Sequence, residues 1–95
     1  MTYTITIQEE AIIEMQEAFE WYENKRNGLG YELLAKIEAC FLKISNNPAH
    51  NTHINETYWR IKTQKFPYLI IYEIEELFVF IFAIRHAKQR PIEQH

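Results

Sequence analysis

The sequence contains no aspartate, so all 13 of its acidic residues are glutamate. Serine and cysteine occur once each, as Ser45 and Cys40, and the two glycines are Gly28 and Gly30. The missing aspartate argues against a Ser-His-Asp triad and against magnesium sites rich in carboxylates. Two glycines one residue apart cannot form a phosphate-binding P-loop or a dinucleotide fingerprint. The composition therefore leaves little room for nucleophilic catalysis by the protein's own side chains or for nucleotide binding.

The sequence also lacks the features of exported and membrane proteins. A single cysteine cannot form an intrachain disulfide, which favours a reducing compartment. Residues 1–7 have no basic segment and no long apolar run, unlike a signal peptide. The longest strongly apolar run, residues 77–84, is too short to cross a bilayer. We therefore expect a cytoplasmic protein without membrane contact, folded as one domain over residues 1–95.

Charge is distributed unevenly along the chain, which has a formal net charge of −3. Residues 1–47 contain eight glutamates and four basic residues, whereas residues 48–95 contain five glutamates and six basic residues. A mildly acidic protein lacks the surplus of cations that nonspecific binding to nucleic acid requires. A local basic patch in the second half is still compatible with this composition.

Two segments, 9–25 and 30–45, have apolar residues at the spacing of an amphipathic helix. The apolar positions are Ile12, Met15, Phe19 and Tyr22 in the first, and Leu34, Ile37, Phe41 and Ile44 in the second. Thr6 and Glu9 match the capping-box pattern, which predicts that Thr6 caps the first helix. Gly28 is expected to end that helix, because glycine adopts the left-handed conformation at low cost.

Four other segments favour β-strands because they are rich in β-branched and aromatic residues: 2–7, 58–63, 68–74 and 77–84. The polar run 49–56 predicts a loop. The order β-α-α-β-β-β indicates an α+β fold, in which a helical hairpin packs on one face of an antiparallel sheet and the first strand lies at an edge.

Several short motifs together resemble those of the RelE/ParE superfamily of small toxins from type II toxin–antitoxin modules, nearest its ParE-like, plasmid-stabilisation branch. These motifs are Trp21-Tyr22-Glu23, Gly28-Leu29-Gly30, Asn47-Pro48, Arg60, Phe66-Pro67-Tyr68-x-Ile70-x-Tyr72, His86 and Pro91. The resemblance covers almost the whole chain in the same order. It implies a microbial-RNase-like fold and a cognate antitoxin as partner, with no cofactor.

The resemblance leaves the target open. RelE-type toxins cut mRNA on the translating ribosome without a metal ion, whereas ParE-type toxins act on DNA gyrase. We expect a toxin that arrests growth through DNA gyrase or translation. A metal-independent, ribosome-dependent mRNA endoribonuclease and an inactive toxin-like binding protein are the alternatives. A dimer or a toxin–antitoxin hetero-oligomer is compatible with each of these.

Metal-independent RNA cleavage would use the 2′-hydroxyl of the substrate as nucleophile, so the protein must supply a base, an acid and cations. Arg60 and Lys62 lie two residues apart on one predicted strand and could bind a single phosphate. His86 could act as acid or base, and Arg90 could hold the phosphate by two hydrogen bonds. The candidate catalytic residues are therefore Arg60, Lys62, His86 and Arg90, without a metal ion.

Further residues near these positions are candidates for binding the substrate or target: Tyr68, Tyr72, Arg85 and Lys88. Each candidate also has a structural interpretation. Arg60 and Lys62 are equally typical of a solvated strand face, the two tyrosines of core packing, and His86 of a strand end. His50 and His53 have a ligand-like spacing, but they lack a third ligand for zinc.

Two departures from the RelE-type pattern favour gyrase as the target. RelE-type ribonucleases carry an arginine directly after the tyrosine of the third strand, where this chain has Leu69. Many relatives carry an arginine where this chain has Gln89. Because catalysis that depends on several cations falls steeply when one is lost, both changes argue against a ribonuclease.

Overall fold

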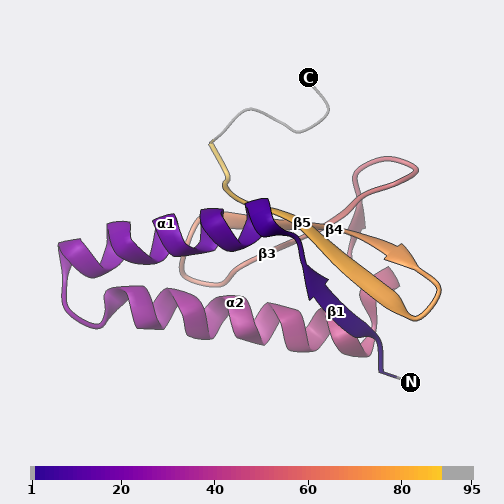
Figure 1. Cartoon of the computed structure of the whole chain (residues 1–95), viewed down its shortest axis with the longest axis horizontal. Coiled ribbons are helices and arrows are strands. Elements are labelled where there is room, and N and C mark those ends of the chain that lie inside the picture. The colour runs from indigo at the N-terminus through magenta and orange to yellow at the C-terminus, as the bar shows by residue number, and fades with distance from the viewer. Residues whose placement is uncertain (1, 89–95) are drawn as a thin grey trace.

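Two helices lie side by side and pack against a five-stranded sheet in the computed structural model, which describes residues 2–88 (Figure 1). The elements are β1 (Thr4–Ile7), α1 (Glu9–Lys25), α2 (Leu29–Asn46), the 3-10 helix η1 (Pro48–His50), β2 (Thr52–His53), β3 (Trp59–Lys62), β4 (Tyr68–Glu75) and β5 (Phe78–His86). The predicted α+β order is confirmed, and α1 has the predicted bounds. The predicted loop 49–56 also contains most of η1 and the two-residue strand β2. Within residues 2–88, no helix combines the length and apolar character needed to cross a membrane.

The strand order is β1-β5-β4-β3-β2, which places β1 at an edge as predicted. The prediction of a purely antiparallel sheet is wrong, because β1 runs parallel to β5. The backbone N–H of Thr4 donates to the Leu77 carbonyl, and that of Gln8 donates to the Ile81 carbonyl. These bonds align β1 with the first half of β5 only, so the second half of β5 extends beyond the end of β1.

A β-bulge in β5 determines which of its side chains face the helices. Ile71 of β4 lies opposite Ala83, but Tyr72 lies opposite Ile81, so Phe82 is an extra residue. The bulge reverses the alternation of faces along the rest of β5. As a result, Arg85 lies on the sheet face that the helices leave uncovered, here called the outer face, and His86 lies on the helix side opposite Tyr68.

The helix α1 contacts the core through a stripe that shares Met15 and Tyr22 with the predicted one but has Ala11 and Ala18 at its other two positions. Ala11 and Ala18 are fully or almost fully buried, and Met15 and Tyr22 pack against the same core. Ile12, predicted to face the core, is 44% exposed. Two of the four positions are thus shifted by one residue, and the small alanine side chains there allow α1 to lie close to the sheet.

The core face of α2 is formed by Leu33, Ile37, Cys40 and Ile44, all of them buried. Ile37 and Ile44 were predicted core positions, and Leu33 and Cys40 take the places of Leu34 and Phe41, with Cys40 as a small core residue. Burial raises the pKa of the Cys40 thiol above its ordinary value. Because the reactive species is the thiolate, Cys40 is a poor nucleophile in the folded protein.

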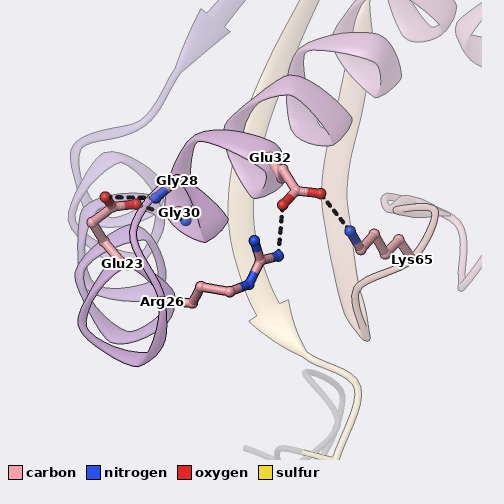
Figure 2. Close-up of polar contacts among 6 residues, drawn as sticks. All are labelled: Glu23, Arg26, Gly28, Gly30, Glu32 and Lys65. Carbon is pink, nitrogen blue, oxygen red and sulfur yellow. Dashed lines mark hydrogen bonds and ion pairs between the residues drawn. The ribbon is translucent and has the colours of Figure 1, made fainter.

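The connection between the helices is held by the Glu23 carboxylate, which accepts hydrogen bonds from the backbone N–H groups of Gly28 at 2.9 Å and Gly30 at 3.0 Å (Figure 2). Gly28 has a φ of 90°, in the left-handed region where glycine was expected. The predicted cap at Thr6 is wrong. Thr6 belongs to β1, and α1 begins after Gln8 without a side-chain cap, since β1 continues almost to the helix.

Candidate functional site

The outer face of the sheet carries the predicted basic residues in neighbouring rows. Lys62 of β3 lies opposite Leu69 of β4, which lies opposite Arg85 of β5. Arg60 lies one row further along β3, opposite Ile71. Because adjacent strands are about 4.8 Å apart, these three cations surround one area of the outer face, here called the basic end and defined as Arg60, Lys62 and Arg85.

The three cations of the basic end differ in their partners. Arg60 and Lys62 are exposed, and within residues 2–88 neither makes an ion pair. Arg85 is half-buried, and its Nε lies 3.5 Å from an oxygen of Glu14 on α1. Leu69 provides no charge between Lys62 and Arg85. The basic end can therefore attract an anion, but only two of its cations are free to approach it.

His86 lies on the other side of the sheet from Arg60 and Lys62. Its ring and the Tyr68 ring meet in a T-shaped arrangement at a centroid distance of 5.4 Å. It lines a cleft between α1 and the sheet together with Glu14, Glu17 and Trp21. The backbone N–H of Lys88 donates to His86 Nδ1 at 3.1 Å. The structure thus surrounds His86 with aromatic and acidic side chains instead of with the two β3 cations.

The two candidate tyrosines of β4 belong to the core. Tyr72 is 0% exposed. Its hydroxyl donates to the Pro48 carbonyl oxygen at 2.6 Å and accepts a hydrogen bond from Asn51 Nδ2 at 2.9 Å. Tyr68 is also buried, and burial raises the pKa of both phenols above the ordinary value. Tyr72 therefore presents no surface to a partner, and its hydroxyl holds η1 and the following segment against β4.

The remaining candidates lie in or near the end of the described chain. Lys88 is exposed. Arg90, Gln89 and Pro91 lie outside the described residues. Between residues 2 and 88, no three His, Cys or Glu side chains are grouped as a metal site would require. His53 stacks instead on Trp59, with ring centroids 3.7 Å apart.

Sequence reasoning missed the aromatic part of the outer face. Phe78 and Phe80 stack there at a centroid distance of 6.3 Å, and Tyr58 contacts Phe82 at 5.0 Å. Phe78 is 47% exposed. The alternating phenylalanines at positions 78, 80 and 82 were a signal for one aromatic strand face. The continuous apolar run of β5 concealed this signal, because the residues between them are apolar too.

A family model described as the ParE toxin of type II toxin-antitoxin system, parDE, matches residues 5–91. Among solved structures, the chromosomal ParDE toxin–antitoxin system from P. aeruginosa superposes with a TM-score of 0.79 at 6% identity, covering 92% of this chain and 98% of the other. The isolated E. coli RelE toxin gives a TM-score of 0.69 at 16% identity, covering 96% of this chain and 90% of the other. A doubly substituted E. coli RelE in the free state gives 0.66 at 16% identity, covering 93% and 86%. No curated protein matches the sequence. At these identities the structural likeness shows the fold alone.

Proposed function

We propose that this chain, which belongs to the ParE toxin family of type II toxin–antitoxin systems, arrests growth by binding and inhibiting DNA gyrase. The family model covers residues 5–91, and the fold is that of ParE and RelE toxins. Membership of a toxin–antitoxin family implies an antitoxin as partner. The choice of gyrase over RNA, and a cytoplasmic location where gyrase acts, are parts of the proposal.

One observation carries the choice of target: the sheet separates His86 from Arg60 and Lys62. Arg60 and Lys62 lie on the outer face, whereas His86 contacts Tyr68 on the helix side. General acid–base catalysis needs the acid or base within hydrogen-bond reach of the reacting group, near the cations that stabilise the phosphate. This separation supports a toxin that acts by binding and does not cleave RNA.

The basic end supports the same choice. Leu69 stands between Lys62 and Arg85 and cannot stabilise charge on a phosphate. Arg85 is also held by Glu14 of α1. A site that retains two free cations can bind a phosphate group, but it lacks the dense positive charge that phosphate cleavage requires.

The exposed aromatic side chains of the helical hairpin are the proposed contact points for gyrase, with Trp21 at the rim of the cleft that contains His86. The hairpin exposes large apolar side chains, with Trp21 of α1 at 59% and Tyr31 of α2 at 64% exposure. Trp21 also lies under the ammonium group of Lys25, 4.5 Å from the ring centroid. Exposed aromatic side chains of this kind are typical anchors of protein–protein contacts.

A ribosome-dependent mRNA endoribonuclease is the second candidate function. It is favoured by Arg60 and Lys62, which are exposed and make no ion pair within residues 2–88. Two neighbouring cations on one strand could hold an RNA phosphate. His86 would then have to act from the other side of the sheet, or Arg90 would have to contribute.

A supercoiling assay tests the proposal. Purified gyrase is titrated with the chemically synthesised and folded chain, with Trp21→Ala, and with the double variant Arg60→Ala/Lys62→Ala. We expect the unmodified chain and the double variant to inhibit supercoiling, and Trp21→Ala to require at least tenfold more protein. Gyrase that stays fully active at saturating protein rules out the proposal.

A second experiment distinguishes the alternatives in cells. The chain and the variant Arg60→Ala are induced, growth is followed, and RNA ends are mapped. Growth arrest without new ribosome-dependent cuts supports action by binding. Cuts that disappear with Arg60→Ala establish the endoribonuclease instead, and unaffected growth establishes an inactive relative.

A further inference from the structure

The outer face of the sheet is charged oppositely at its two ends. The basic end consists of Arg60, Lys62 and Arg85. Glu73 and Glu75 of β4 point to the same face, because they alternate with residues of the helix side, and they pair with Phe80 and Phe78 of β5. We call these two glutamates the acidic end. The two ends lie on neighbouring strands. Their nearest members, Arg60 and Glu73, are two residues out of register along the strands.

Between and beside these ends, the outer face is aromatic. Phe78 and Phe80 stack on each other, and the Tyr58 ring packs on Phe82 next to the bulge. Ile71 and Ala83 form a small buried cluster against which Ile54, Tyr58 and Phe82 pack. The face is therefore an apolar strip with a cationic and an anionic end, and none of the helices within residues 2–88 covers it.

Apart from Arg85, which contacts Glu14, the charged side chains of this face make no ion pair with another described residue. Within residues 2–88, no ion pair involves Arg60, Lys62, Glu73 or Glu75. Arg60 and Glu73 lie on adjacent strands of the same face, two residues out of register, without making an ion pair. The free charges are thus available to a surface that brings the opposite sign to each end.

We propose that the occupant of this face is a second copy of the same chain, packed outer face to outer face about a two-fold axis that crosses the strands. The outer face of each copy carries both positive and negative side chains, so the outer faces of two copies can be complementary in charge. A two-fold axis makes each contact twice, so every favourable pair counts double.

The register of β3 and β4 shows how the charges would meet. An axis midway between Glu73 and Ile71 brings Ile71 of one copy over Glu73 of the other, and Leu69 over Glu75. Because Arg60 lies beside Ile71 and Lys62 beside Leu69, each cation then lies about one strand spacing, ~4.8 Å, to the side of a glutamate of the second copy. Arginine, lysine and glutamate side chains are long enough to cover that offset.

The orientation of the axis follows from the charges. An axis along the strands would place the basic end of one copy over the basic end of the other, and like charges at close range oppose association. The aromatic strip provides the apolar area, and the two charged ends fix the direction of packing. The dimer is therefore expected to be antiparallel in its strands and to weaken as salt screens the charges.

Charge reversal tests the proposal on the chemically synthesised chain. One variant carries Glu73→Lys and Glu75→Lys, which makes the outer face wholly basic. The other carries Arg60→Glu and Lys62→Glu, which adds two glutamates to Glu73 and Glu75 on the outer face. As a control matched to the first variant, Glu20→Lys and Glu38→Lys make the same increase of net charge on exposed positions of the two helices.

Sedimentation equilibrium over a hundredfold range of concentration gives the association constants. We expect the unmodified chain and the control to dimerise, and each reversed variant alone to associate at least tenfold more weakly. An equimolar mixture of the two reversed variants restores a one-to-one heterodimer, because opposite signs meet again at both ends. This restoration also shows that both variants are folded.

Three results would overturn the proposal. The unmodified chain could stay monomeric at millimolar concentration, the reversed variants could dimerise as tightly as the control, or their mixture could show no heterodimer. Circular dichroism and thermal unfolding of each variant separate the last result from a failure to fold. A variant that fails to fold is replaced by its single substitutions, Glu75→Lys and Lys62→Glu, for which the same pattern of loss and restoration is expected.

Discussion

The carboxylate of Glu14 on α1 accepts a hydrogen bond of 2.8 Å from the backbone N–H of Ile84 in β5. The strand β1 pairs with β5 only as far as Ile81, so the N–H of Ile84 has no strand neighbour on that side. Glu14 replaces the missing strand with a side-chain acceptor. It also lies 3.5 Å from the Arg85 guanidinium and so connects α1 to the end of the sheet.

Removing this acceptor should destabilise the fold. Ile84 is buried, so Glu14→Ala leaves its N–H without a partner, at a cost of about 1–3 kcal/mol in the free energy of unfolding. Glu14→Gln keeps an oxygen acceptor and should lose less than half as much. Denaturant titration measures both variants, with Glu17→Ala as the exposed control. Equal losses for the Gln and Ala variants would assign the effect to the charge instead of the hydrogen bond.

The sequence was sufficient to predict α1, α2 and four of the five strands in their order, because the periods of 3.6 and two residues do not depend on distant contacts. It was not sufficient to choose between Ile12 and Ala11 as the core position of α1. Hydrophobicity favours isoleucine, whereas the close approach of α1 to the sheet requires the smaller side chain. The parallel pairing of β1 with β5 joins opposite ends of the chain, so no local pattern contains it.

The candidate site was predicted in part for a related reason. Arg60 and Lys62 alternate with Trp59 and Ile61, so their shared outer face follows from period two. In β5 almost every residue before Arg85 is apolar, and such a run does not show where a bulge falls. A single extra residue therefore moved His86 to the helix side and Arg85 to the outer face.

Gly30 should not tolerate a side chain. A Cβ at this position would lie 2.6 Å from the Phe19 carbonyl oxygen and 2.7 Å from the Phe19 ring. Gly30→Ala is expected to cost about 1–3 kcal/mol in the free energy of unfolding, as other overpacked positions do. Adding Phe19→Leu should not restore stability, because the carbonyl oxygen stays in place. Recovery in that double variant, measured by denaturant titration, would contradict the backbone contact.

Gly28 provides the comparison for Gly30. Apart from Gly28 and its two chain neighbours, no atom of the described residues lies within 4 Å of a Cβ placed there, but its φ of 90° is unfavourable for other residues. Gly28→Ala should therefore lose about 1 kcal/mol through backbone strain alone. Gly28→Asn should lose less than Gly28→Ala, since asparagine adopts this conformation more readily. A larger loss with asparagine would indicate that something other than backbone strain determines the effect.

The pKa of Glu32 should be measurably low. Its carboxylate accepts a hydrogen bond from Lys65 and another, of 2.8 Å, from Arg26 (Figure 2). These two contacts, with Lys65 the larger, lower the pKa of Glu32 from its ordinary value of 4.5. Carbon-13 NMR of the side-chain carboxyl should show this, and Lys65→Ala should move the titration midpoint back upward. Lys36→Ala, which removes a lysine outside the group, should leave the midpoint unchanged.

This shift also gives a sign for the pH dependence of stability. A carboxyl group with a lower pKa in the folded state stabilises the protein above its unfolded pKa and loses that contribution as the pH falls through the folded pKa. The stability difference between the unmodified chain and Glu32→Gln should therefore be present at neutral pH and vanish below the folded pKa of Glu32. A difference that grows on acidification would contradict the assignment.

Tyr72 should matter for stability and not for the target. Tyr72→Phe removes the hydrogen bonds to the Pro48 carbonyl oxygen and from Asn51, and should cost about 1–3 kcal/mol in the free energy of unfolding. Tyr58→Phe is the control, because its hydroxyl makes no hydrogen bond within residues 2–88; it should stay within about 0.5 kcal/mol. Combining Tyr72→Phe with Asn51→Ala should cost less than the sum of the two, since they share one hydrogen bond.

Supercoiling assays below the unfolding temperature should show unchanged inhibition by Tyr72→Phe. A loss of inhibition in the folded variant would mean that Tyr72 becomes accessible when the target binds.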